Sequence, residues 1–259
     1  MSRKLLKSLL IVCVCALVSA CQTTTGRSSF PNTGPQTPKS DKALIHAKLA
    51  RGYLQQEQYA VAKAELDKAL RIDSNHSESN YVMALLMLDL QQYNEAEQHF
   101  ARAVKADSRN SAAAHDYGVY LCKIGQERKA LVYFEMAVSN PLFDRSELSY
   151  MRAGECLARV GDPDAERYLR TALKLDPKLR PALFRLAQIN YDRANYLSAR
   201  AYVERYLAIT KAKPPALLLA YRIEIRNGAQ EVADKYRNLL LDQFPGSEEA
   251  AMVRGSQRK

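Results

Sequence analysis

The chain has 259 residues, of which 47% are hydrophobic and 25% are charged, so its composition is that of an ordinary globular protein. This composition excludes a disordered chain, a collagen and a multi-span membrane protein. Lysine and arginine exceed aspartate and glutamate by ten, which by itself suggests a nucleic-acid partner. The positions of these charges along the chain decide whether that suggestion holds.

Residues 1–20 predict an export signal. They carry three cations and no acid, followed by an apolar run over residues 9–18. A helix of that length extends about 15 Å, whereas the hydrocarbon core of a bilayer is about 30 Å thick. A basic start, a short apolar run and small residues before a cleavage point are typical of a secretory signal rather than of a membrane span.

The end of this segment predicts lipid attachment. Val18-Ser19-Ala20-Cys21 resembles the bacterial lipobox, in which the signal is cut before a cysteine that receives acyl chains such as palmitate. The alternative is an ordinary secretory signal with a chance cysteine. Gln22 follows, not the aspartate that resembles an inner-membrane retention signal, and this favours the outer membrane of a Gram-negative cell. Residues 21–42, rich in Thr, Ser, Gly and Pro, are expected to be a flexible tether.

A repeat of about 34 residues occupies the rest of the chain. A small residue is followed by a large residue four positions later and by another small one three positions after that. Four copies keep this pattern, and two later copies, which start at Ala199 and Ala233, depart from it. The complete copies are Ala62, Leu66 and Ala69; Ala96, Phe100 and Ala103; Ala130, Phe134 and Ala137; and Ala165, Leu169 and Ala172.

This period, with a second apolar helical face upstream of each copy, resembles the tetratricopeptide repeat. Alanine is needed where two helix axes approach to about 8–10 Å. We therefore expect an all-α fold, a right-handed superhelical solenoid of about six repeats, rather than a generic helical bundle. The expected repeats cover 43–247, with a frayed C-terminal tail at 248–259. Their bounds are 43–76, 77–110, 111–144, 146–179, 180–213 and 214–247.

The remaining net charge is concentrated in the fifth repeat, 180–213, at +5, while the second and third repeats are slightly acidic. A nucleic-acid binder is expected to spread its cations along a groove, so the sequence argues against one. The basic repeat is either a solvated face or a patch for an acidic partner or anionic lipid headgroups. Its cations are Arg180, Arg185, Arg193, Arg200, Arg205, Lys211 and Lys213.

No catalytic or metal-binding motif is found in the sequence, so we expect neither an enzyme, nor a cofactor, nor a metal site, nor a small-molecule substrate. His115-Asp116 is an adjacent pair, but neighbouring residues on a helix point apart. After removal of the signal and lipidation of Cys21, only Cys122 and Cys156 remain, in an oxidising compartment. They are either two buried thiols or, as we favour, a disulfide that closes a loop of about 35 residues.

The order of these features resembles the PilF/PilW family of type IV pilus biogenesis lipoproteins over nearly the whole chain. One departure is His115-Asp116, where some relatives have two asparagines, which puts any partner contact there in doubt. The resemblance rests on Asp107 through Tyr117-Gly118, Cys122, Asn140-Pro141-Leu142-Phe143, Ala153-Gly154-Glu155-Cys156, Leu217-Leu218-Leu219 and Phe244-Pro245-Gly246-Ser247.

The resemblance implies a pilotin. Such a lipoprotein would bind secretin subunits, assist their localisation and multimerisation at the outer membrane, and support twitching motility; a disulfide is also a feature of part of the family. A general periplasmic scaffold in envelope or cell-wall assembly is the alternative, and an enzyme subunit or regulator is a third. From the repeat register we expect a partner-binding groove lined by Ala47, Arg51, Leu54, Tyr81, Leu85, Leu88, His115 and Val119. The alternative for Tyr81, Leu85 and Leu88 is that they only pack against the next repeat.

Overall fold

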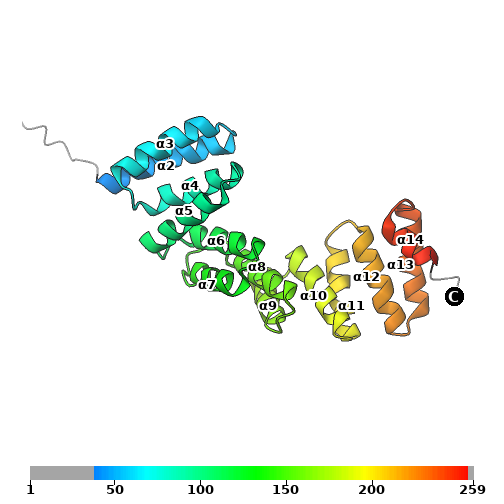
Figure 1. Ribbon diagram of the computed structural model, residues 1–259. Coiled ribbons are helices and arrows are strands. Elements are labelled where there is room, and N and C mark those ends of the chain that lie inside the picture. Colours follow the sequence, from blue (N-terminus) through cyan, green and yellow to red (C-terminus); the bar gives the residue numbers. More distant parts are fainter. Residues whose placement is uncertain (1–37, 256–259) are drawn as a thin grey trace, which may run out of the picture. The chain divides into compact units, whose positions relative to one another are not determined.

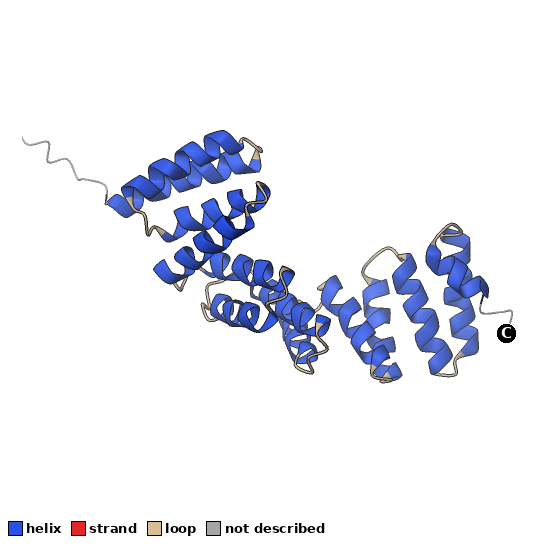
Figure 2. Ribbon diagram, in the orientation of Figure 1, coloured by secondary structure: helices blue, strands red, loops and turns tan. Residues whose placement is uncertain are grey.

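The computed structural model describes residues 38–255, and within them every regular element is an α-helix (Figures 1 and 2). The predicted signal, Cys21 and most of the tether lie outside these residues. The helices are α2 (Lys39–Gln55), α3 (Tyr59–Ile72), α4 (Ser77–Asp89), α5 (Tyr93–Ala106), α6 (Ser111–Lys123), α7 (Glu127–Val138), α8 (Ser146–Arg159), α9 (Ala165–Leu175), α10 (Arg180–Asp192), α11 (Tyr196–Ala208), α12 (Pro214–Arg226), α13 (Gln230–Gln243) and α14 (Glu248–Gly255).

The helices are arranged as consecutive pairs, from α2–α3 to α12–α13, and each pair packs on the next along the chain. The predicted all-α repeat solenoid is thereby confirmed. A tight turn joins the two helices of each pair, and one residue in it has a positive φ: a glycine in three of the turns, but Glu57, Gln91 and Ala194 in the other three. This left-handed residue reverses the chain within a few positions.

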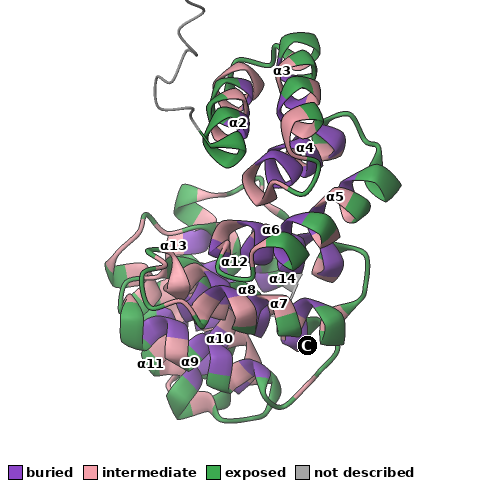
Figure 3. Ribbon diagram, turned by 90° about the vertical axis from the view of Figure 1, so that its left-hand side faces the viewer, coloured by how far each residue is buried: buried purple, intermediate pink, exposed green. Residues whose placement is uncertain are grey.

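The four complete copies of the small–large–small pattern lie on the second helix of a pair, as predicted. Its alanines are fully buried or nearly so, and Phe100 and Phe134 are buried between them. Figure 3 shows buried residues along the faces where neighbouring helices meet. The core therefore consists of a series of apolar clusters along the stack, each formed by residues of neighbouring helices. This is expected of a stack in which no single repeat buries its own apolar face.

Two predicted boundaries are wrong. Helix α2 begins at Lys39, inside the range given to the tether and directly after Pro38, and Asp41 supplies the acidic first turn that a helix N-terminus favours. Residues 248–255 are not frayed but form α14. The Ser247 hydroxyl accepts a hydrogen bond from the Ala250 N–H at 3.1 Å, and Val253 is buried against the last pair.

Candidate protein-docking groove

A groove lies between α4 and α6. The first helices of neighbouring pairs pack more closely at α2–α4, α6–α8, α8–α10 and α10–α12 than at α4–α6, where residues of both helices line a cavity of about 650 Å³. Most of its lining side chains are apolar, and three are charged. We name this cavity the α4–α6 groove; its lining residues are Leu85, Leu88, Asp89, Tyr93, Asp116, Val119, Tyr120, Lys123 and Ile124.

Helical spacing places the lining of the groove on one face of each helix. On α4, Leu85, Leu88 and Asp89 are related by three and four positions. On α6 the groove residues are likewise three or four positions apart: Asp116, Val119, Tyr120 and Lys123. Leu85, Leu88 and Val119 are only partly buried, while Tyr93 and Ile124 are exposed. The two helices therefore present a connected apolar surface to solvent.

Tyr81 lies beside the groove and does not line it. Its side chain is only 3% exposed, and its hydroxyl donates a hydrogen bond to the Asp116 carboxylate, which ties α4 to α6. Burial, together with that carboxylate, raises the pKa of Tyr81. The Arg51 guanidinium lies 4.9 Å from the ring centroid and pairs with Glu78. Tyr81 and Arg51 thus position the helices.

His115, predicted to face the groove, points instead to α8. Its ring is 6% exposed, packs against Phe134 and Phe143, and shares a hydrogen bond between Nδ1 and the Ser149 hydroxyl at 2.7 Å. Burial lowers the pKa of His115, so the neutral ring is favoured. The prediction was wrong by one residue: on a helix, the next position is turned by about 100°, and the neighbouring Asp116 is the groove residue.

Two of the other predicted positions also lie outside the groove. Ala47 is fully buried in α2, and Leu54 packs against the cluster between the first two pairs. Of the eight predicted residues, only Leu85, Leu88 and Val119 come together. The prediction missed Tyr120 and Lys123, although both share the helical face of Val119, so a full reading of the face of α6 would have found them.

Cys122 and Cys156 form a disulfide between α6 and α8, with their Cα atoms 5.8 Å apart. Arg159 donates a hydrogen bond from Nη1 to the Cys122 carbonyl at 2.9 Å. The disulfide and the His115–Ser149 hydrogen bond both join residues 34 positions apart, and they lie seven residues apart along α6. Two links therefore hold the same faces of α6 and α8 together.

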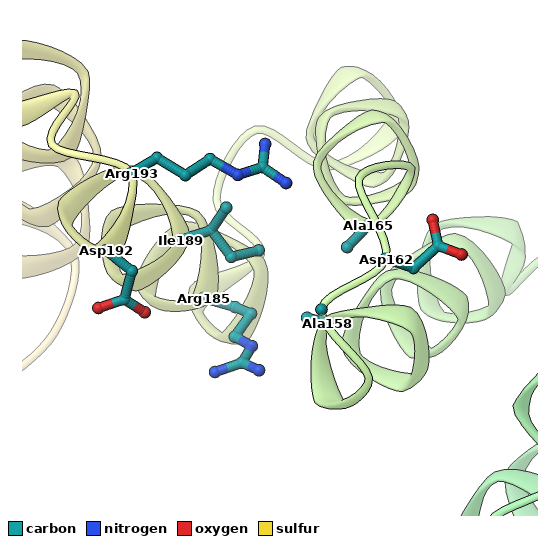
Figure 4. A pocket seen from close by; sticks show the side chains of 8 residues that line it. Ala158, Asp162, Ala165, Arg185, Ile189, Asp192 and Arg193 are labelled. Atoms are coloured by element: carbon teal, nitrogen blue, oxygen red, sulfur yellow. The ribbon is translucent and has the colours of Figure 1, made fainter.

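Most cations of the fifth repeat have partners within the protein. Arg193 pairs with Glu166 at 2.9 Å, and Arg200 donates from Nε at 2.7 Å to Glu224, a carboxylate only 1% exposed. Arg205 donates to the Pro177 carbonyl at 3.1 Å. Figure 4 shows Arg185 on α10 and Arg193 directly after its end, opposite Ala158 of α8 and Ala165 of α9, and these residues line a cavity of about 140 Å³.

Two classes of site are absent from the part of the chain that the structure describes. No group of three or more His, Cys, Asp or Glu residues between 38 and 255 is placed to hold a metal ion. No helix in that range has the length and hydropathy needed to cross a bilayer.

Comparisons with known proteins point to one group of helical-repeat proteins. A family model described as anaphase-promoting complex, cyclosome, subunit 3 matches residues 34–103. The type IV pilus assembly protein PilF of Pseudomonas aeruginosa is 25% identical over 86% of this chain and 91% of its own length.

Solved structures agree in fold. The structure of P. aeruginosa PilF covers 84% of this chain and 99% of its own, with a TM-score of 0.71 at 22% identity. PilW, described as a widely conserved type IV pilus biogenesis factor, covers 82% of this chain and 97% of its own, with a TM-score of 0.67 at 26% identity. YrrB, described as a tetratricopeptide-repeat protein with an unusual peptide-binding site, reaches a TM-score of 0.58 at 23% identity over 68% of this chain and 90% of its own.

Repeat proteins of this type are interaction scaffolds and not a class of enzymes. The small–large–small helix pairs, the stacked core and the similarity over most of both chains lead to the same conclusion: this chain is a PilF/PilW-like tetratricopeptide-repeat protein.

Proposed function

We propose that this protein is a scaffold of type IV pilus assembly and that it binds an apolar segment of a partner protein in the α4–α6 groove. The relatives named for pilus assembly and pilus biogenesis match it over most of their length. A helical-repeat stack has no chemistry of its own to offer, but its surface suits the binding of peptides.

The observation that carries the proposal is the groove itself. Leu85, Leu88 and Val119 are only partly covered, in a cavity of about 650 Å³ that is wide enough for several side chains. Apolar surface left in water is unfavourable, and a connected patch rimmed by polar groups is typical of an interaction site. Asp89 and Lys123, two exposed residues of the lining with opposite charges, can fix the direction of a bound segment.

We propose secretin subunits as the partner and the outer membrane as the location. The lipobox-like sequence ending at Cys21 supports attachment of lipid to that residue, and residues 22–37 would then link the membrane to α2. Several acyl chains anchor a protein stably, whereas a single chain does so only marginally. Replacement of Cys21 by serine should move the protein from the membrane fraction to the soluble periplasmic fraction.

The experiment is a pull-down of the secretin with a groove variant. Leu85→Glu places a charge in the apolar lining, which should lower secretin capture at least about tenfold because a buried charge without a partner is costly. Leu197→Glu is the matched control, since Leu197 lies on α11 outside the groove and is 73% exposed. Circular dichroism should show the same helical content in both variants.

Equal capture by Leu85→Glu and by the unaltered protein would contradict the groove. A deletion strain that keeps secretin multimers and twitching motility would contradict the pilus role, and would leave a general envelope scaffold as the better account.

A further inference from the structure

A second pocket lies at the start of the fifth helix pair, away from the α4–α6 groove. Arg180, Pro181 and Phe184 from the first turns of α10 line it, together with Tyr206 near the end of α11 and Thr210 and Lys213 from the following loop. Its volume is about 290 Å³. The Phe184 and Tyr206 rings lie with their centroids 5.4 Å apart, so the pocket combines aromatic walls with two cations.

The cations around this pocket lack partners, unlike the other cations of the same repeat. Within residues 38–255, Arg180, Lys211 and Lys213 make no ion pair or side-chain hydrogen bond, whereas Arg193 and Arg200 are paired with glutamates. Residues 1–37 and 256–259 contain no aspartate or glutamate. The pocket is therefore left with positive charge that a carboxylate of another molecule can neutralise.

Two of these cations also stand where a helix disfavours them. Arg180 is the first residue of α10, and Lys213 precedes the first residue of α12. The amide dipoles at a helix N-terminus favour negative charge, so a cation there weakens the helix. Local stability does not explain these residues, but an acidic ligand bound between the two helix starts would.

We propose that this pocket binds an acidic peptide segment of a protein partner, with carboxylates on either side of an apolar side chain. The carboxylates would pair with Arg180 and Lys213, and the apolar side chain would pack on Phe184 and Tyr206. A membrane surface is less suited, because the rings line a pocket that a flat layer of headgroups does not enter. The site is separate from the α4–α6 groove and does not depend on the pilus role.

The test is fluorescence anisotropy with the full chain in detergent. The probe is a labelled peptide with carboxylates on both sides of a central leucine, and its counterpart carries the corresponding amides. We expect the acidic peptide alone to bind, and the double variant Arg180→Glu/Lys213→Glu to weaken binding at least about tenfold. Folding should be preserved, because glutamate is favourable at a helix N-terminus.

The matched control is Lys42→Glu/Arg128→Glu, two exposed cations in the first turns of α2 and α7 with the same change in net charge. It should bind the acidic peptide like the unaltered protein. Equal losses in both double variants, or equal binding of the amide peptide, would overturn the proposal. So would an absence of peptide binding accompanied by Arg180- and Lys213-dependent binding to anionic vesicles, to inorganic phosphate or to a second copy of the chain.

Discussion

At the scale of single residues, glycine is required where the two helices of a pair approach most closely. A Cβ atom added at Gly154 would lie 2.6 Å from Leu169 Cγ and 2.9 Å from the Ala165 carbonyl oxygen, and one at Gly118 would lie 2.9 Å from the Phe134 ring. At Gly52, within α2, such a Cβ would have no atom within 4 Å apart from its chain neighbours and the nearby backbone of its own helix. Replacement of glycine by alanine should therefore lower stability at Gly154 and raise it at Gly52.

Gly154→Ala should lower the free energy of unfolding by about 1–3 kcal/mol, because overpacking outweighs the gain in helix propensity. Gly52→Ala should raise it by about 0.5–1 kcal/mol, since alanine is the better helix former and meets no neighbour. Urea unfolding followed by circular dichroism measures both. A Gly154→Ala variant as stable as Gly52→Ala would show that the helices do not approach as described.

The buried histidine predicts a dependence of stability on pH. The pKa of His115 is lowered in the folded protein, first by burial and then by Arg145 and Arg152, against the opposing effect of Asp116. The unfolded chain therefore takes up the proton first, and stability should fall as the pH drops below about 6.5.

Thermal unfolding between pH 7.5 and 5.5 should show this loss, and His115→Gln should reduce it, because glutamine does not titrate in that range. Part of the slope should remain, since burial also lowers the pKa of His99. If the dependence of thermal stability on pH is unchanged in His115→Gln, the loss of stability at low pH comes from other titratable groups.

At the scale of helices, α6 has two distinct faces. One carries His115 and Cys122 and is held to α8, while the other carries Asp116, Val119 and the remaining groove residues. The disulfide between Cys122 and Cys156 thus fixes the position of one wall of the groove. Loss of the disulfide should therefore lower both the stability of the protein and its affinity for the partner.

Replacing both cysteines by serine should lower the free energy of unfolding by roughly 3–4 kcal/mol in the chain-entropy model, given a closed loop of about 35 residues. Hydrogen exchange should rise first in α6 and α8, because stability in a repeat stack is local. Reducing agent should destabilise the unaltered protein but not the double variant. Two free thiols in non-reducing mass spectrometry of the purified protein would contradict the link.

The helices themselves follow from sequence periodicity, but the groove follows only in part. Spacing identifies α4 and the apolar residues Leu85 and Leu88, because one face of a helix can be read from its pattern. It does not reveal that α6 turns His115 to α8, since this depends on Ser149 in another repeat. Nor does it reveal α14, a short helix that is stabilised by burial of Val253 on the last pair.

At the scale of the whole molecule, the excess positive charge is divided among segments in which the cations have different roles. The predicted export signal carries three of the ten net charges, and the fifth repeat carries five. Within that repeat, Arg193 and Arg200 are structural, whereas Arg180 and Lys213 border an aromatic pocket without partners of their own. We therefore propose that this charge serves a second docking site rather than a nucleic-acid surface.

The central claim is that the α4–α6 groove holds a component of the pilus assembly machinery, and photo-crosslinking in the native membrane tests it most directly. A crosslinking amino acid in place of Leu88 should capture the secretin subunit, and the same group in place of the exposed Leu197 should not. Capture of cell-wall synthesis proteins from position 88, or of the same proteins from both positions, would contradict the account.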